Sequence, residues 1–316
     1  MIENTPKIVV ITGPTATGKT KLSVALAKEF DGEIVSADSM QIYRRMDIGT
    51  AKVTPEEAEG IPHHMVDIAE PNEAYSVARY VAEASAAVED ILSRGKLPIV
   101  VGGTNLYIDS LISGRDFADN EEDNSLRREI DREYEETGGE KMLEILREFD
   151  PERASKLHPA DRRRIVRAIE IFRLTGKTIT QHDLETQALP PRYEAAMLAL
   201  DFEDRADLYA RIDKRVDIMA EQGLFEEVKA LLEEGIPESS TAMQAIGYKE
   251  PAAFFRGEIT KDEALELIKR ESRRYAKRQL TWLRRNEKLF WIRHKAQPDF
   301  NEARRLSTEY LHSFGL

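Results

Sequence analysis

The sequence predicts an α/β fold: a mostly parallel sheet of the phosphate-loop type, flanked by helices and carrying an inserted helical subdomain. Three observations predict it. Short β-branched strands alternate with amphipathic helices in the first third of the chain. A glycine-rich loop follows the first of these strands. Strand patterns then disappear over residues 117–190 and return afterwards.

The first strand is expected at residues 7–12, an apolar run that ends at Gly13. A helix is expected from Lys19 to Phe30, because its apolar residues recur at helical spacing. A strand, a glycine loop and a helix therefore open the chain.

Two more strands are expected, at residues 33–36 and 97–101. A helix over about residues 75–94 separates them. Because strands joined through helices cross over with right-handed connections, these strands should lie parallel in one sheet.

The predicted domain organisation is a core interrupted by an insertion. Residues 1–116 are expected to form the first part of the core, 117–190 the inserted helical subdomain, and 191–316 the second part of the core. In that last part we expect strands at 196–200 and 289–292, and helices at 205–223, 224–234 and 260–283.

Composition bounds the class of protein. The chain has 316 residues, 41% of them hydrophobic, which is enough for a sizeable core. No apolar run approaches the roughly 18 residues that span a bilayer, so we expect a cytoplasmic protein without membrane attachment. Cysteine is absent, which excludes disulfides and Cys-bound zinc, so that any metal should be a hard cation on oxygen ligands.

A phosphate-binding loop is the strongest local motif. It matches G-x-x-x-x-G-K-[ST] between the first strand and helix, and comprises Gly13, Pro14, Thr15, Ala16, Thr17, Gly18, Lys19 and Thr20. Its backbone N–H groups and the helix N-terminus favour phosphate, Lys19 adds a charge, and the Thr20 hydroxyl suits Mg²⁺. Kinases, NTPases and some transferases share this loop, so the motif predicts a polyphosphate and leaves its identity open.

Further segments resemble the tRNA dimethylallyltransferase family, and the resemblance covers roughly residues 8–292. The matching segments lie at 38–44, 47–52, 60–67, 102–107, 158–168, 245–250 and 275–282. Thr17 stands where the family more often has Ser, and its hydroxyl is retained. The C-terminal zinc finger of eukaryotic relatives is missing, which indicates a bacterial-type enzyme.

The resemblance implies a reaction and its partners. The dimethylallyl group of dimethylallyl diphosphate is transferred to N6 of an adenosine beside the tRNA anticodon (position 37 in tRNA numbering), and diphosphate is released. The partners are therefore dimethylallyl diphosphate and the tRNA anticodon stem-loop, with Mg²⁺ as cofactor. We expect a monomer, and whether a nucleotide such as ATP also binds the loop stays open.

The catalytic residues expected from this reaction are Asp38, Lys19, Thr20 and Arg211. The adenine amine is a poor nucleophile, so a carboxylate should remove its proton, and Asp38 follows a strand end where α/β sheets bind ligands. Asp38 could instead be a Mg²⁺ ligand or a helix cap. A cation for the leaving group is expected on helix 205–223, where Arg211 is preferred to Arg215 by resemblance.

Contacts to tRNA are expected from two regions. By resemblance, Asp38, Ser39, Met40, Gln41 and Thr104 position the target nucleotide and Arg127 contacts the tRNA. A basic cluster in the insertion, with Arg162, Arg163 and Arg167, suits backbone phosphates. Although the formal net charge is −12, residues 269–288 hold nine basic and two acidic residues, which is either a polyanion footprint or a solvated helix face.

Two other functions remain open at this stage. The phosphate loop alone favours a nucleoside or small-molecule kinase. A non-catalytic tRNA-binding module would use the basic helices and leave the loop without a role.

Overall fold

The computed structural model describes residues 5–114, 125–187 and 189–316. The chain divides into two compact units. The first comprises Met1–Ile112 and Arg192–Leu316, and the second comprises Ser113–Pro191. The sheet lies entirely in the first unit, and the second unit is helical.

A six-stranded parallel sheet forms the centre of the first unit, in the order β3-β2-β4-β1-β5-β6. Its strands are β1 (Lys7–Thr12), β2 (Gly32–Ser36), β3 (His63–His64), β4 (Leu97–Gly102), β5 (Glu194–Phe202) and β6 (Phe290–His294). Thr12 pairs with Gly102 and Ser36 with Val101, so the strands end at one level. The predicted parallel α/β fold is confirmed.

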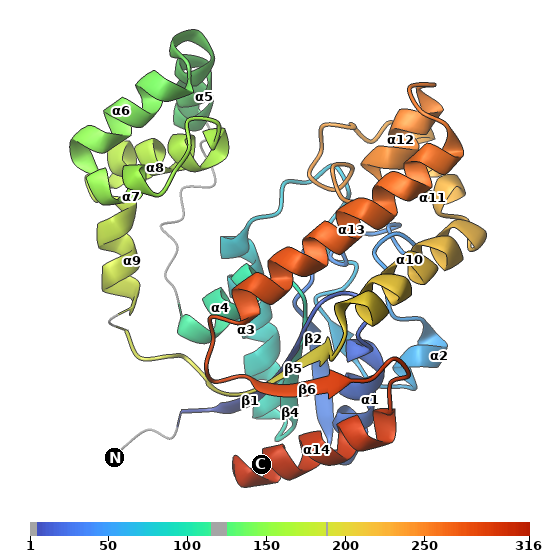
Figure 1. Ribbon diagram of the computed structural model, residues 1–316. Helices are drawn as coiled ribbons and strands as arrows, with labels where there is room; N and C mark the ends of the chain where they lie inside the picture. The colour runs from blue at the N-terminus through green and yellow to red at the C-terminus, as the bar shows by residue number, and fades with distance from the viewer. Residues whose placement is uncertain (1–4, 115–124, 188) are drawn as a thin grey trace. The chain divides into compact units, whose positions relative to one another are not determined.

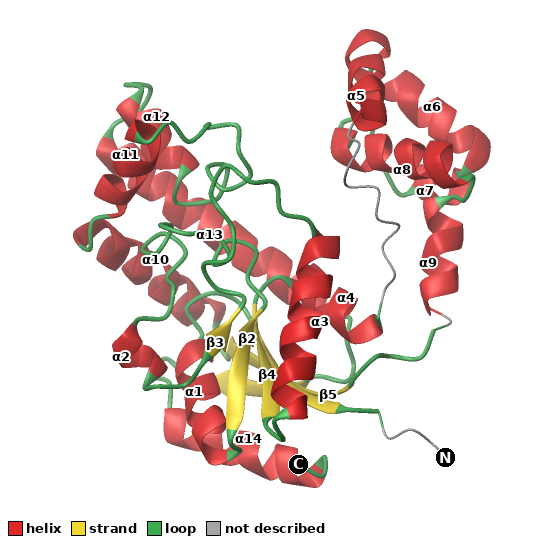
Figure 2. Ribbon diagram, turned by 180° about the vertical axis from the view of Figure 1, so that it is seen from behind, coloured by secondary structure: helices red, strands yellow, loops and turns green. Residues whose placement is uncertain are grey.

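Helices cover both faces of the sheet. Strands β1, β2 and β4 contact α1 (Lys19–Glu29) on one face, and α14 (Phe300–Ser313) packs beside it (Figure 1). The other face carries α3 (Val77–Ser93), which Figure 2 shows in front of β2 and β4. Between α1, α14 and the sheet, alternate residues of the strands, such as Val9 and Ile11, form a fully buried apolar core.

A layer of helices lies beyond the carboxyl ends of the strands. Helix α13 (Lys261–Leu283) runs along α10 (Arg205–Glu221), and α11 (Leu224–Glu233) and α12 (Lys249–Phe255) pack at its N-terminal end (Figure 1). Buried side chains of these helices form a second core with residues 42–46. The layer therefore stands over the edge where the sheet presents its loops.

The remaining helices of the first unit are short. They are α2 (Pro55–Ala58), begun by a Thr54 capping box, and α4 (Asn105–Ser113), which follows β4. In the described parts of the chain, no helix combines the length and apolarity needed to cross a bilayer.

The second unit has its own core. It contains α5 (Ser125–Thr137), α6 (Gly139–Phe149), α7 (Pro151–Ser155), α8 (Arg162–Thr175) and α9 (Ile179–Gln187). Ile130, Met142, Leu146, Ile165 and Ile169 are buried together in it. The expectation of helices without strands in this segment is confirmed among the described residues.

Several elements were not among those expected from the sequence. His63 and His64 form the short edge strand β3, whose backbone pairs with β2. His64 Nε2 lies 2.8 Å from Glu33 Oε2. Helices α2, α4, α12 and α14 were not predicted either. Asp299 caps α14 by accepting from two backbone N–H groups.

Candidate active site

The phosphate loop lies between β1 and α1, as its motif predicts. Gly18 has φ +87°, in the left-handed region that glycine favours, and begins α1. Ala16 also has a positive φ of 66°, which is uncommon for a residue with a Cβ. The Thr17 hydroxyl donates to Pro14 O at 2.9 Å, so the loop is held partly by its own side chains.

Lys19 is turned back onto this loop. Its ammonium donates to the carbonyl oxygens of Gly13 (2.9 Å) and Pro14 (2.8 Å). Burial, and next the positive charge of Arg215, lower the pKa of Lys19 to about 8, while Asp38 opposes the shift. A bound polyanion would supply the countercharge that this amine lacks.

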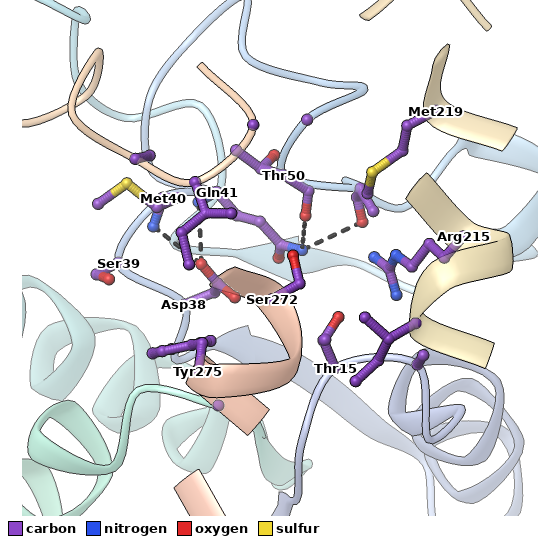
Figure 3. A pocket seen from close by; sticks show the side chains of 18 of the residues that line it. Thr15, Asp38, Ser39, Met40, Gln41, Thr50, Arg215, Met219, Ser272 and Tyr275 are labelled. Atoms are coloured by element: carbon purple, nitrogen blue, oxygen red, sulfur yellow. Dashed lines mark hydrogen bonds between the residues drawn. The ribbon is translucent and has the colours of Figure 1, made fainter. Parts of the chain in front are cut away.

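Asp38 follows β2 and faces the same cavity. Its Oδ1 accepts from the backbone N–H groups of Met40 (2.9 Å) and Gln41 (3.4 Å) (Figure 3). These bonds fix the direction of the carboxylate. Asp38, Lys19 and Thr20 line one cavity of about 500 Å³, so three of the four residues expected to be catalytic are brought together.

The residues expected around the target nucleotide form a connected rim. Ser39 N donates to Thr104 Oγ1 at 3.1 Å, and the Thr104 hydroxyl donates to Ser39 Oγ at 3.3 Å. Gln41 Nε2 donates to the carbonyls of Thr50 and Ala51, each at 3.2 Å. Ser39, Met40 and Gln41 line the cavity. Thr104 contributes indirectly, through its hydrogen bonds to Ser39.

The two arginines of α10 have different surroundings. Arg215 lines the same cavity as Asp38 and Lys19, and Figure 3 shows it across the cavity from Asp38. Among the described residues, no carboxylate lies within ion-pair distance of it. Burial lowers the pKa of Arg215 below its ordinary value, and the charge of Asp38 opposes this. Arg211 Nε instead donates to Ala16 O at 3.1 Å, and the guanidinium stacks over Phe202.

Arg211 therefore holds the strained residue of the phosphate loop, whereas Arg215 reaches the cavity. The sequence favoured Arg211 as the catalytic cation. One turn of helix separates the two residues, and only the packing of α10 against the loop decides which of them faces the substrate space. Which one acts on the leaving group stays a prediction.

The fit of a magnesium ion rests on Thr20. The described residues contain no cluster of three or more His, Asp or Glu that could hold a metal. Mg²⁺ commonly takes one or two protein oxygens and completes its shell with phosphate and water. The Thr20 hydroxyl in the cavity wall suits that mode and no all-protein site.

Comparison with known proteins assigns the chain. A family model described as IPP transferase matches residues 41–286, and one described as isopentenyl transferase matches residues 6–70. This chain belongs to the IPP transferase family. A relative from Caldanaerobacter subterraneus named tRNA dimethylallyltransferase is 48% identical over 96% of this chain and 97% of its own. One of the same name from Acetivibrio thermocellus is 50% identical over 90% and 91%.

Two solved structures are similar over nearly the whole of this chain. The tRNA isopentenylpyrophosphate transferase of Bacillus halodurans has a TM-score of 0.72 and 40% identity, with 98% of each chain covered. A eukaryotic dimethylallyltransferase acting on tRNA has a TM-score of 0.82 and 31% identity, with 98% of this chain and 80% of that chain covered.

Several cavity residues of this IPP transferase were not singled out as site residues from the sequence. Ser272 and Tyr275 of α13 line the cavity opposite the phosphate loop (Figure 3). Burial, and next the negative charge of Asp38, raise the pKa of Tyr275 to about 12, so its hydroxyl keeps its proton at neutral pH. The segment 275–279 carried the family resemblance, but nothing local indicated that it turns toward Asp38.

Glu227 is a second residue that the sequence did not reveal. Its carboxylate accepts from the backbone N–H groups of Asp47 (2.8 Å), Ile48 (2.8 Å) and Gly49 (3.1 Å). It also accepts from the Tyr248 hydroxyl at 2.6 Å. Gly49 and the next two residues line the cavity, so a side chain of α11 fixes part of its wall.

The arginines of the helical unit are mostly paired within that unit. Arg127 and Arg167 both contact Glu170, a carboxylate that is only 2% exposed, at 3.1 and 2.9 Å. Arg162 pairs with Asp131 at 2.8 Å. Arg163 is exposed and has no ion-pair partner among the described residues. Arg127, Arg162 and Arg167 thus contribute to the unit's stability whatever else they bind.

Proposed function

We propose that this protein transfers the dimethylallyl group of dimethylallyl diphosphate to N6 of an adenosine adjacent to the tRNA anticodon and releases diphosphate. One observation carries the proposal: a phosphate loop and a fixed carboxylate, Asp38, line the same cavity in a member of the IPP transferase family. A small-molecule kinase could also use the loop together with a carboxylate base, but it would not explain the nine basic and two acidic residues of the segment 269–288. The names of the relatives also support prenyl transfer over a kinase.

The first step in the mechanism is activation of the amine. N6 of adenine is weakly nucleophilic because its lone pair is delocalised into the ring. Backbone N–H groups occupy Oδ1 of Asp38, so Oδ2 is the oxygen that accepts the N6 proton. As the new C–N bond forms, the electron pair of the breaking C–O bond passes to the diphosphate, and the proton passes to Asp38.

The second step is stabilisation of the leaving group. Negative charge grows on the diphosphate as the C–O bond breaks. The N–H groups of residues 13–20, Lys19 and Arg215 face that charge from the loop and from α10. Mg²⁺ held by Thr20 and by diphosphate oxygens would neutralise further charge. Diphosphate binding should also release Lys19 from the Gly13 and Pro14 carbonyls.

Access of the adenine sets the RNA requirement. The cavity lies between the strand ends and helices α10 and α13, so a base must leave its stack to reach it. The free energy of unstacking is lowest in a single-stranded loop. Ser39, Met40 and Gln41, supported by Thr104, would hold the extruded base, and α13 would contact the backbone. In the helical unit, Arg163 is the best placed of the expected contacts, since Arg127, Arg162 and Arg167 already have carboxylate partners.

These substrates imply a reaction in the cytoplasm. We propose that the protein acts as a monomer. A competition assay with ATP would measure whether a nucleotide also binds the loop.

The test replaces Asp38 with Asn. The amide retains an oxygen for the two backbone donors but cannot take a proton. We expect kcat to fall by about 10²- to 10⁴-fold, with the Kd for an anticodon stem-loop changed by less than about threefold. Asp262→Asn is the matched control, since it makes the same chemical change at an exposed aspartate of α13 that does not line the cavity and has no ion pair among the described residues.

Two results would overturn the proposal. One is transfer by Asp38→Asn at the parent rate. The other is an unmodified adenosine after incubation of the parent protein with tRNA, dimethylallyl diphosphate and Mg²⁺, together with label transfer from γ-labelled ATP to a small acceptor.

A further inference from the structure

One face of α13 carries a stripe of cations with a tryptophan inside it. Its members are spaced at positions i, i+3, i+4, i+7, i+8 and i+11, which places them on one side of a helix. All are exposed, and together they line a groove of about 370 Å³, which we call the basic groove: Arg274, Lys277, Arg278, Thr281, Trp282 and Arg285.

The charges of the basic groove are largely uncompensated. Among the described residues, Lys277, Arg278 and Arg285 have no ion-pair partner. Cations on another side of the same helix do: Lys269 pairs with Asp217 at 2.7 Å, and Arg273 pairs with Asp213. The cations of α13 that face α10 are therefore neutralised by carboxylates of α10. Those of the basic groove remain available to an anion.

Trp282 is held in a fixed orientation although it is exposed. Its side chain is 45% exposed, and its Nε1–H donates to Asp109 Oδ2 of α4 at 2.9 Å. The indole also lines a second hollow of about 520 Å³, shared with Arg285 and Lys288. Trp282 thus stands between two hollows with cations on both sides, where ring surface is open to a planar partner.

The groove adjoins the active-site cavity. Arg278 lines both, and its guanidinium lies over the ring of Tyr275, which faces Asp38. A strand whose base entered the cavity would therefore have its next phosphates near Arg278 and Lys277. A free indole beside cations that track a backbone is the arrangement by which proteins bind single-stranded nucleic acid.

We propose that Trp282 stacks against an unpaired base of the RNA neighbouring the reacting adenosine, with Lys277, Arg278 and Arg285 contacting its flanking phosphates. The inference deepens the proposed function and rests on it for the identity of the RNA. It adds a specific stacking residue to a surface otherwise defined only by charge. Because every base has a ring face, this contact holds the loop in place without selecting its sequence.

Fluorescence tests the stack directly. The chain has two tryptophans, so Trp291→Phe leaves Trp282 as the single reporter. We expect an anticodon stem-loop to quench its emission in the absence of prenyl diphosphate, and stem-loops with single abasic sites to identify one loop position on which quenching depends. Poly-glutamate is the control polyanion without bases. Equal quenching by poly-glutamate, or quenching that survives every single abasic site, would overturn the inference.

Variants connect the stack to catalysis. Trp282→Ala should raise the KM for RNA by about 10- to 100-fold and leave the KM for dimethylallyl diphosphate unchanged. Trp282→Phe keeps a ring but lacks the N–H that bonds Asp109, so it should recover most of the RNA affinity if stacking matters. If Trp282→Phe loses as much RNA affinity as Trp282→Ala, with both melting temperatures near that of the parent, the Asp109 bond matters and stacking does not.

The outcome is separable from the proposed function. Should the stem-loop quench Trp282 without any prenyl transfer, the surface inference holds and the reaction is wrong. Should transfer proceed with an unchanged KM for RNA in Trp282→Ala, the reaction holds and the stack is wrong.

Discussion

Replacement of Glu227 by Gln should weaken the hydrogen bonds that hold residues 47–49, and so displace the part of the cavity wall formed by residues 49–51. Four donors converge on this carboxylate: three backbone N–H groups of residues 47–49 and the Tyr248 hydroxyl. An amide keeps one acceptor oxygen and turns an N–H₂ toward the other pair of donors. Two hydrogen bonds to a charged acceptor are therefore lost, whichever way the amide is oriented.

The magnitude follows from those two bonds. Each hydrogen bond to a charged group contributes about 1.5–3 kcal/mol. Glu227 is half-buried, so water can satisfy part of what is lost, and we expect the free energy of unfolding to fall by about 2–4 kcal/mol. The carbonyls of Thr50 and Ala51, which orient Gln41, would shift with the loop. A displacement of this kind should lower kcat/KM for tRNA by roughly 10- to 100-fold.

Urea unfolding and steady-state kinetics measure the two effects. Glu226→Gln is the matched control, because Glu226 lies on the same helix, is exposed, and has no hydrogen bond or ion pair among the described residues. The control should stay within about 0.5 kcal/mol of the parent. If Glu227→Gln behaves like its control in both assays, the idea that α11 positions this wall is refuted.

Three further predictions concern the cavity. Arg215→Met should lower kcat/KM by about 10²- to 10³-fold, as expected for a group that stabilises the leaving group. Arg211→Met should lower it by less than about tenfold. The reverse order in steady-state kinetics would assign that role to Arg211. Lys19, with its pKa lowered to about 8, is charged below that pH and neutral above it. Calorimetry relative to Lys19→Met should therefore show weaker binding of inorganic pyrophosphate as pH rises through about 8, and Arg215→Met should move this transition upward; a constant difference from pH 7 to 9 contradicts the assignment. Gly49→Ala would place its Cβ 2.5 Å from Cε2 of Tyr248, so denaturant unfolding should register a loss of about 1–3 kcal/mol, and unchanged stability would mean that the ring moves freely.

The sequence by itself determined the core of the fold. Strand 7–12, the glycine loop and helix 19–30 are specified locally, because apolar period and glycine position act within a few residues. The two-residue strand β3 escaped detection, since a strand of that length carries no period of its own. Its pairing with β2 is decided by a strand 29 residues earlier in the chain, since His63 pairs with Ile34 and His64 with Val35.

The site divides in the same way. The phosphate loop and the strand end at Asp38 could be read from the chain, because parallel strands bring their carboxyl ends to one edge. Whether Arg211 or Arg215 of one helix reaches the cavity depends on how α10 packs against the loop. The contribution of Tyr275 depends likewise on how α13 crosses the sheet edge.

Glu227 marks the limit most clearly. Its backbone partners lie about 180 positions earlier in the chain. A glutamate on the polar side of an amphipathic helix is normally expected to face solvent, and no local feature indicates these partners. The sequence determines which chemistry is available at the sheet edge. Tertiary packing decides which side chains point toward that edge. Their direction is set by contacts between elements that no short-range sequence pattern encodes.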